Sequence, residues 1–241
     1  MVELLELIQK RRSQRSPYDR QRQIDPGDVR KILEAGRWAP TAHNMQNYEI
    51  VVVDDRQQLD AIGKLNFSLS EVFVTENYSM LSFSEAELAQ KKVGILGTMF
   101  PPFMRKPDFK LADLTDEEKK GMGARIPLQA TSVLMVVVYD PGRRAPASEG
   151  DFLGIMSLGC VMENMWLMAS SLGIGLHILS SLAADPVEKE LKRLLDIPVH
   201  LKIAFTCRLG YPTEAQGAYM RVRRDIEDFT HHNRFGKKGL G

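Results

Sequence analysis

The most constraining feature of this 241-residue sequence is a segment at 152–172 that is apolar almost all round. A helix with apolar side chains on every side belongs in the interior of a fold, because a surface helix keeps one polar face toward water. The segment ends at Leu172-Gly173-Ile174-Gly175, where a glycine can take the left-handed conformation that often closes a helix. We therefore predict a central buried helix with the other elements arranged around it.

Four segments have the residue patterns of strands. The run 132–139 is almost continuously apolar, as expected for a strand that is buried on both faces. Residues 199–209 alternate between apolar and more polar side chains, which predicts one face on a core and a more polar opposite face. The β-branched run 48–53 and the short segment 176–179 are the other two predicted strands.

Helical patterns are interleaved with these strands. Apolar residues recur at helical spacing in 2–12, and Asp25-Pro26 and Asp185-Pro186 each combine a cap with a first-turn proline. Asp55 can cap a further short helix. This order predicts an α+β sandwich in which a mixed sheet lies between helices, with residues 1–241 forming a single domain.

Two segments stand outside this alternation. Residues 66–127 contain the capping-box patterns Ser84-x-x-Glu87 and Thr115-x-x-Glu118, but too little continuous apolar sequence for a core of their own. We predict that residues 66–127 form a variable insertion or lid within the domain. The C-terminal stretch that ends in HHNRFGKKGLG has little apolar content and predicts an extended arm.

Composition and charge argue against several classes of protein. Lys and Arg number 32 and Asp and Glu 31, and the net charge of +1 offers no general attraction to nucleic acid or to acidic membranes. No run of 18 apolar residues is present, so no membrane-spanning helix is expected. The acidic residues near the N-terminus are unlike a signal peptide, and Cys160 and Cys207 are typical of reduced core thiols in a cytoplasmic protein. The histidines and cysteines lack the spacing of a metal site, so no metal is expected.

Two basic clusters are candidates for binding an anion. Directly after the first predicted helix, Arg11, Arg12, Ser13 and Arg15 combine guanidinium groups with a hydroxyl, a set that suits the oxygens of a phosphate. The same cations would also suit a solvated helix C-terminus without any ligand. The second cluster, 221–224, is by itself typical of a charged surface. Together the two clusters have enough charge to neutralise one phosphate dianion.

A third polar cluster is the loop 39–46, which carries Thr41, Asn44 and Gln46. Their side chains can donate to and accept from a ring with amide-like edges, although threonine and asparagine are also common in turns. The sequence contains no Walker A motif, no Ser-x-Gly nucleophile elbow and no G-x-G-x-x-G fingerprint. No catalytic triad or carboxylate pair is recognisable either, so an enzyme of this sequence would depend on a bound cofactor.

Taken in order, these motifs resemble the nitroreductase family of flavin enzymes. The resemblance rests on RRSQR after the first helix, on AGRWAPTAHNMQ before the strand YEIVVVDD, and on the apolar helix that leads into SLGIGLHIL. It continues with LGYP, a basic pair and HHNRFG. It covers roughly residues 1–65 and 130–236, whereas 66–127 does not align and is where members of this family differ.

The resemblance implies a homodimer with two FMN sites at the subunit interface. Arg11, Arg12 and Ser13 would hold the phosphate and the ribityl chain of FMN. Arg15 would lie near the pyrimidine edge of the ring, where a cation stabilises the anionic reduced flavin.

Three further groups of residues match segments that the family places around FMN. The first is a loop that contacts the ring, typically from the partner subunit: Pro40, Thr41, Ala42, Asn44 and Gln46. The second is the segment whose backbone N–H faces flavin N5: Leu179, Ser180 and Ser181. The third is the basic pair that closes on the phosphate, Arg221 and Arg223, with Arg224 as the competing register.

The resemblance also implies the activity. An FMN-dependent oxidoreductase of this kind would pass a hydride from NAD(P)H through flavin N5 to a nitroaromatic, a quinone or a similar flat acceptor, by a ping-pong mechanism. No catalytic side chain is assigned, because solvent can supply the protons. His177 beside the expected site is either a core histidine bonded to backbone or a donor that faces the ligand. The alternatives are a flavin-binding storage or sensing protein without efficient turnover, and a dehalogenase-like or flavin-fragmenting member of the same fold.

Overall fold

The computed structural model describes residues 3–65, 82–97, 112, 114–115, 128, 130–148, 150–185, 187–213 and 220–239. The chain divides into two compact units, one formed by residues 1–67 and 118–216 and the other by residues 68–117 and 217–241. Most of the predicted lid, 66–127, lies outside the described residues. Its role and the single-domain organisation therefore remain predictions.

The first unit is built on a four-stranded sheet with the strand order β1-β4-β6-β5. Neighbouring strands pair antiparallel, while an isolated parallel bridge joins Ser13 to Leu176 at the β5 edge. The strands are β1 (Glu49–Val53), β4 (Val133–Tyr139), β5 (Gly175–Ile178) and β6 (Lys202–Gly210). All four lie within or close to the segments predicted as strands.

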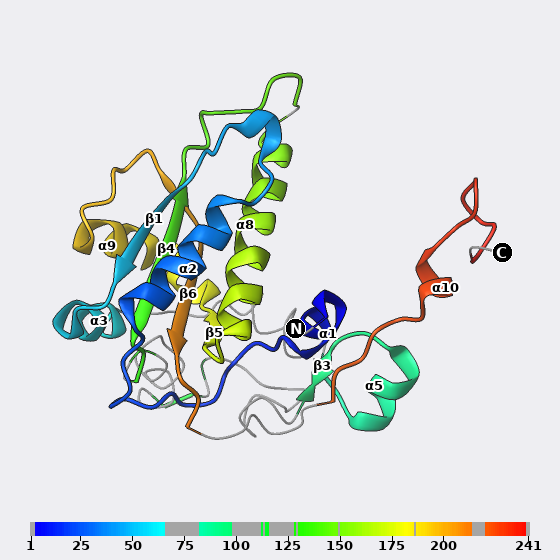
Figure 1. Cartoon of the computed structure of the whole chain (residues 1–241), viewed down its shortest axis with the longest axis horizontal. Helices are drawn as coiled ribbons and strands as arrows, with labels where there is room; N and C mark the ends of the chain where they lie inside the picture. Colours follow the sequence, from blue (N-terminus) through cyan, green and yellow to red (C-terminus); the bar gives the residue numbers. More distant parts are fainter. Residues whose placement is uncertain are drawn as a thin grey trace. The chain divides into compact units, whose positions relative to one another are not determined.

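Helices cover both faces of this sheet (Figure 1). On one face α2 (Pro26–Arg37) and α8 (Phe152–Ser171) pack over Val133, Met135 and Val137 of β4. On the other face, α3 (Arg56–Gly63) and α9 (Val187–Leu194) pack over the alternate residues of the same strand, Leu134, Val136 and Val138. One strand thus contributes to two separate cores, which confirms the α+β sandwich and the prediction of a strand buried on both faces.

Side-chain caps explain where the helices begin. Asp25 accepts a hydrogen bond from the backbone N–H of Gly27 (2.7 Å) before α2, and Asp55 accepts one from Gln58 (2.8 Å) before α3. Each carboxylate satisfies an N–H that the helix itself leaves unpaired. Shorter elements of this unit are α1 (Leu4–Lys10) and the 3₁₀ turns η1 (Ala42–Asn44) and η6 (Ser180–Ala183).

The described part of the second unit contains two short strands and two short helices. The parallel strands β2 (Ser82–Phe83) and β3 (Ile95–Leu96) flank α5 (Glu85–Lys91). α5 begins with the predicted capping box, in which Ser84 and Glu87 each bond the other's backbone N–H. The C-terminal segment carries α10 (Ile226–Phe229), and Lys92 after α5 pairs with Asp225 before α10.

Strand β6 has its apolar side chains on the core, but its polar face is not in water. Phe205, Cys207 and Leu209 join the core under α2 and α8, as the alternation predicts. Thr206 and Arg208, on the opposite face, are also fully buried. The reason is that other parts of the chain cover this face: Thr206 donates to the Leu179 carbonyl (2.7 Å), and Arg208 donates to the backbone carbonyl groups of 14–16.

Helix α8 is less buried within one chain than its sequence predicts. Leu158, Val161, Met165 and Ala169 are buried against the sheet and α2. In the first turns of the helix, Phe152, Ile155 and Met156 are 66%, 50% and 54% exposed. The prediction of a helix enclosed on all sides is therefore wrong for the isolated chain.

By length and composition, α8 would also be able to cross a membrane, which the sequence analysis did not anticipate. Two polar residues in its middle instead bond other parts of the first unit. Glu163 pairs with Arg11 (3.1 Å), and the amide of Asn164 donates to the carbonyl of Ala35 (3.1 Å). These contacts, together with the buried face, are those of a helix folded into the sandwich.

Candidate functional site

The basic segment after α1 is held along the edge of the sheet. Ser13 forms a parallel bridge with Leu176 of β5, and the backbone N–H of Gln14 donates to the Leu176 carbonyl (2.9 Å). Arg12 and Ser13 are half-buried, Gln14 is buried and Arg15 is exposed. The structure therefore fixes the predicted anion-binding residues to β5 rather than leaving them as a solvated helix end.

A buried arginine from β6 holds the same segment from beneath. The Nη2 group of Arg208 lies 3.2, 3.0 and 3.1 Å from the carbonyl oxygens of Gln14, Arg15 and Ser16. The side chain of Arg208 is 2% exposed, and its guanidinium group lies 4.2 Å from the ring centroid of Tyr18. Three successive carbonyl groups thus converge on one positively charged nitrogen.

His177 on β5 accepts a hydrogen bond from the same arginine. Arg208 Nε lies 3.2 Å from His177 Nδ1, so the imidazole must be neutral at Nδ1 to accept. Burial, followed by the positive charges of Arg208 and Arg15, lowers the pKa of His177 to about 3. His177 is half-buried, and its Nδ1 bonds an arginine side chain rather than the backbone partner expected of a core histidine.

Two glycines allow the basic segment to lie this close to the strands. A Cβ atom on Gly210 would lie 2.4 Å from the Tyr18 ring, and one on Gly175 would lie 2.7 Å from the Gln14 side chain. Such distances are far below van der Waals contact, so a side chain at either position would push the segment 14–18 away from β5 and β6.

Gly210→Ala is therefore expected to lower the free energy of unfolding by about 1–3 kcal/mol, the usual cost of overpacking a core. Urea denaturation of the variant measures this loss. Gly97→Ala is a suitable control, because a Cβ there would meet its nearest neighbour at an ordinary 3.5 Å. Equal stability of Gly210→Ala and the wild-type protein would show that the segment has room to move.

Arg11 is placed differently from the other basic residues of the cluster. Its Nε lies 3.1 Å from a carboxylate oxygen of Glu163, and its guanidinium carbon lies 4.3 Å from the centroid of the Trp166 ring. Trp166 in turn donates from Nε1 to the carbonyl of Arg12 (3.2 Å). These contacts attach the end of α1 to α8, so Arg11 anchors the segment to α8 in addition to any contact with a ligand.

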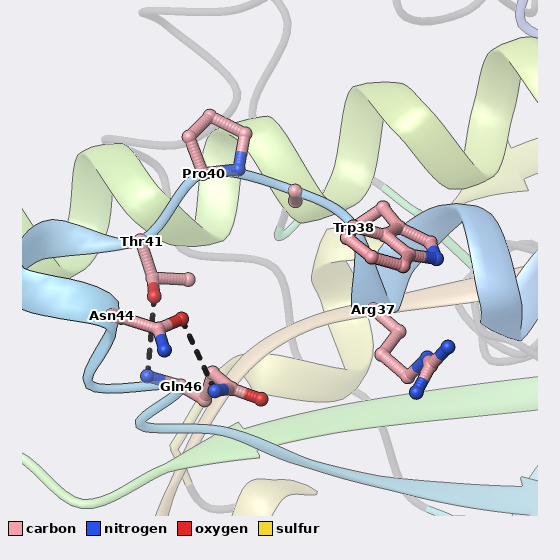
Figure 2. A pocket seen from close by; sticks show the side chains of 7 residues that line it. Arg37, Trp38, Pro40, Thr41, Asn44 and Gln46 are labelled. Carbon is pink, nitrogen blue, oxygen red and sulfur yellow. Dashed lines mark hydrogen bonds between the residues drawn. The ribbon is translucent and has the colours of Figure 1, made fainter.

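The loop that follows α2 lines a pocket of about 440 Å³ (Figure 2). This volume lies in the range of small-molecule sites. The residues that line it are Arg37, Trp38, Ala39, Pro40, Thr41, Asn44 and Gln46. Four of the five loop residues predicted to contact the cofactor are among them, which supports this loop as a ligand-binding element.

Local hydrogen bonds give this loop a tight curl. Thr41 Oγ1 accepts from the backbone N–H of Gln46 (3.2 Å), and Asn44 Oδ1 accepts from Gln46 Nε2 (3.1 Å). His43, Asn44 and Gln46 have φ angles near +50°, a region that non-glycine residues enter at a cost and that is often found at functional sites. The fifth predicted residue, Ala42, donates its backbone N–H to Ser157 Oγ of α8 (3.0 Å).

The remaining predicted residues lie in two places. Leu179 is buried after β5, and its N–H donates to the Thr206 carbonyl (2.9 Å), so this N–H is already engaged. Ser180 is exposed and Ser181 half-buried at the start of η6. Arg221 and Arg223 are exposed in the second unit, where their role as phosphate ligands stays a prediction.

Sequence reasoning missed two contributors. Arg208 appears in the sequence only as one polar position of an alternating strand, and nothing local marks it as buried. Trp38 is 73% exposed at the pocket, where its Nε1 donates to Glu34 (2.7 Å), which also binds Arg37 (2.6 Å). Trp38 belongs to the predicted loop 38–47 and to the motif AGRWAPTAHNMQ, a signal that would have added it to the predicted site residues.

Comparison with known proteins supports one family. The model of the nitroreductase family matches residues 8–211. A protein of Archaeoglobus fulgidus, provisionally named NADH dehydrogenase/NAD(P)H nitroreductase, is 26% identical over 98% of this chain and 100% of its own length. A Staphylococcus aureus NADPH-dependent oxidoreductase is 23% identical over 86% of this chain and 64% of its own length.

Solved structures agree on the fold. A Bacteroides fragilis nitroreductase with bound FMN superposes with a TM-score of 0.58 at 21% identity, covering 97% of this chain and all of the other. An FMN-dependent nitroreductase of Clostridium difficile superposes with a TM-score of 0.56 at 18% identity. The match covers 96% of this chain and all of the other chain. With a family model that spans most of its length, the chain belongs to the nitroreductase family.

Proposed function

We propose that this protein is an FMN-dependent oxidoreductase that passes a hydride from NAD(P)H to a nitroaromatic, a quinone or a similar flat acceptor. The observation that carries the proposal is the basic segment 11–15, which the structure fixes to β5 in a chain of the nitroreductase family. The FMN named in the titles of related structures supports the same cofactor here. Both cysteines are free thiols, in accord with the cytoplasmic location that the proposal includes.

The residues of the segment fit the phosphate end of FMN. Arg11, Arg12 and Ser13 offer charged and hydroxyl donors, and phosphate oxygens accept best from such groups. The carbonyl oxygens of Gln14, Arg15 and Ser16, which would repel an anion, are turned toward Arg208. The backbone that would be unfavourable near a phosphate is thus already neutralised by a buried cation.

The loop 40–46 fits the ring end. Thr41, Asn44 and Gln46 place hydroxyl and amide groups around a pocket that has Trp38 and Pro40 on its wall (Figure 2). Amide groups can both donate and accept, as the edges of a flavin ring require. When bound, FMN would supply the redox chemistry by accepting and donating a hydride at N5.

The chain's own residues then have three tasks. Arg15 would place a positive charge where the reduced ring is anionic. Ser180 at the end of β5 would offer its backbone N–H toward N5. The pocket would hold one flat ring at a time, so that NAD(P)H and the acceptor alternate. Burial raises the pKa of the Cys207 thiol to about 12, so this residue is not available as a nucleophile.

The two halves of this site contact different parts of α8. The loop is attached through Ser157 and the basic segment through Trp166. These residues are nine positions apart, so their attachment points are separated by about 14 Å along the helix axis. We propose that a second copy of the chain, packed on α8 about a two-fold axis, brings its own loop beside this basic segment.

The exposed apolar face of the first unit supports this homodimer. Phe152, Ile155 and Met156 of α8 are exposed, as are Leu4 and Leu5 of the adjacent α1. Exposed apolar side chains on both helices are typical of an interaction surface. In a two-fold dimer the same surface covers itself, so a helix that is apolar almost all round becomes buried.

The proposal predicts that the purified protein is yellow and releases FMN on denaturation. The holoprotein should oxidise NADH or NADPH when a nitroaromatic or quinone is supplied, with the parallel lines in a double-reciprocal plot that a ping-pong cycle produces. A panel of flat acceptors and both nicotinamide cofactors would define the substrates. A protein that stays colourless after incubation with FMN would refute the proposal, and a flavoprotein that reduces none of the acceptors would be a storage or sensing protein.

A further inference from the structure

The buried guanidinium group of Arg208 is costly where it lies. It is on a central strand, 2% exposed, and burial lowers its pKa against the weaker opposing effect of Tyr18. Removing a cation from water costs several kcal/mol, and an apolar side chain of similar volume would often stabilise a core better. Packing alone therefore does not explain why an arginine occupies this position.

The contacts of Arg208 point to the shape of the basic segment. Its guanidinium group donates to three successive carbonyl groups and to His177. An arginine offers five N–H donors in a rigid plane, so it can hold several acceptors in one fixed arrangement. Tyr18 adds to this by donating from its hydroxyl to the Gln14 carbonyl (3.2 Å).

His177 fixes the orientation of the guanidinium plane. With Nε bonded to the imidazole on β5, the plane cannot rotate about the end of the side chain. An arginine stays protonated at neutral pH, so a positive charge lies directly beneath the segment. That charge favours an anion on the other side of the backbone.

We propose that Arg208, oriented by His177, is a positioning residue that shapes the segment 14–16 for binding a phosphate group. This inference rests on the proposed function, because it assigns the phosphate of FMN as the group bound. Arg208 does not touch the ligand. It acts by turning three carbonyl oxygens away from the phosphate and by holding Arg12 and Ser13 in register along β5.

The test compares FMN with riboflavin, which has the same ring but no phosphate. The ratio of the two dissociation constants, measured by flavin fluorescence on the apoprotein reconstituted with each compound, reports the contribution of the phosphate contacts. Arg208→Met is expected to displace the segment and so to weaken at least one charge-assisted contact between its residues and the phosphate, which lowers this preference for FMN by at least about tenfold. Arg208→Lys should retain an intermediate preference, since it keeps the charge but loses the planar fork.

Substitutions at His177 separate orientation from bulk stability. His177→Asn keeps an acceptor near the position of Nδ1 and should keep the preference for FMN. His177→Leu removes the acceptor and should lower the preference, and it provides the test if the Arg208 variants do not fold. Hydrogen exchange of the Gln14 amide, which bonds the Leu176 carbonyl, should accelerate in the same variants.

Arg56 offers a matched control. It is a half-buried arginine of the same unit that donates to the carbonyl groups of Leu128 (2.9 Å) and Thr131 (3.5 Å), neither of which belongs to the predicted site. Arg56→Met should lower stability without changing the ratio of the two dissociation constants. Folded Arg208→Met or His177→Leu protein with the wild-type ratio would overturn the inference, whereas wild-type protein that binds neither flavin would overturn the proposed function instead.

Discussion

An aspartate in place of Ile155 or Met156 is expected to convert the proposed dimer into monomers. Both side chains lie on the exposed apolar face of α8, at 50% and 54% exposure in the single chain. If a second copy covers this face, the introduced carboxylate is buried without a partner, at a cost of several kcal/mol. Two-fold symmetry introduces the charge twice in every dimer, so the dissociation constant should rise by at least about a hundredfold.

The same variants should also lose FMN. The loop 40–46 and the basic segment are attached to α8 about 14 Å apart, so one chain alone holds only half of the proposed site. Sedimentation velocity measures the oligomeric state, and the flavin absorbance of the purified variants measures occupancy. Loss of the dimer with loss of FMN is expected from a site shared between two subunits.

Val199→Asp is the matched control for these substitutions. Val199 is 92% exposed and lies in the chain between β6 and α9, a helix that packs on the opposite face of the sheet from α8. An aspartate there adds the same charge without touching the proposed interface, so dimer and FMN should both be retained. Ile155→Asp protein that remains dimeric and yellow would show that another surface forms the dimer.

Most of the fold follows from local patterns. The caps Asp25 and Asp55 bond groups two or three residues further along the chain, and strand β4 is one continuous apolar run. Such local effects are visible in the sequence. Strand β6 was recognisable by its period of two for the same reason. These elements are sufficient for the sandwich, because an alternating set of helices and strands has few ways to bury its apolar faces.

Features that depend on distant partners were less predictable. The contact of Arg208 with Gln14 joins residues 194 positions apart, and no short pattern distinguishes this arginine from one that faces water. The half-exposed state of α8 is a second case. Its all-round apolar sequence predicts burial on every side, whereas the single chain buries only part of the helix, and the proposed dimer would cover more of it.

The candidate site likewise contains some residues that the sequence could predict and others that it could not. The residues of the basic segment and of the loop 40–46 were found because they are contiguous in sequence and chemically distinctive. The residues that hold them in place were not recognisable in the sequence. Ser157 and Trp166 on α8 are ordinary residues of an apolar helix. The sequence therefore predicted which groups would face a ligand, and the structure adds what holds them in place.

His177 is expected to make the protein less stable as the pH falls from about 6.5 toward 3. Burial and the neighbouring charges of Arg208 and Arg15 lower the pKa of the folded-state imidazole to about 3, whereas an unfolded chain has a histidine pKa near its ordinary value of 6.5. Above pH 6.5 both states are neutral and the effect is absent. Below it, the unfolded state binds a proton that the folded state does not, and each pH unit removes up to about 1.4 kcal/mol until the pH approaches 3.

The measurement is urea unfolding between pH 7 and pH 4 at fixed protein and FMN concentrations, for wild type and His177→Asn. Asparagine can still accept a hydrogen bond from Arg208 Nε but does not titrate. The unfolding free energy of the variant should therefore depend less on pH, by the contribution of one titrating group. The other histidines and the carboxylates contribute equally to both proteins. The difference between the two slopes isolates His177 from every other group. Identical slopes would mean that His177 is protonated as easily in the folded protein as in the unfolded chain, and its hydrogen bond to Arg208 would then not form in solution.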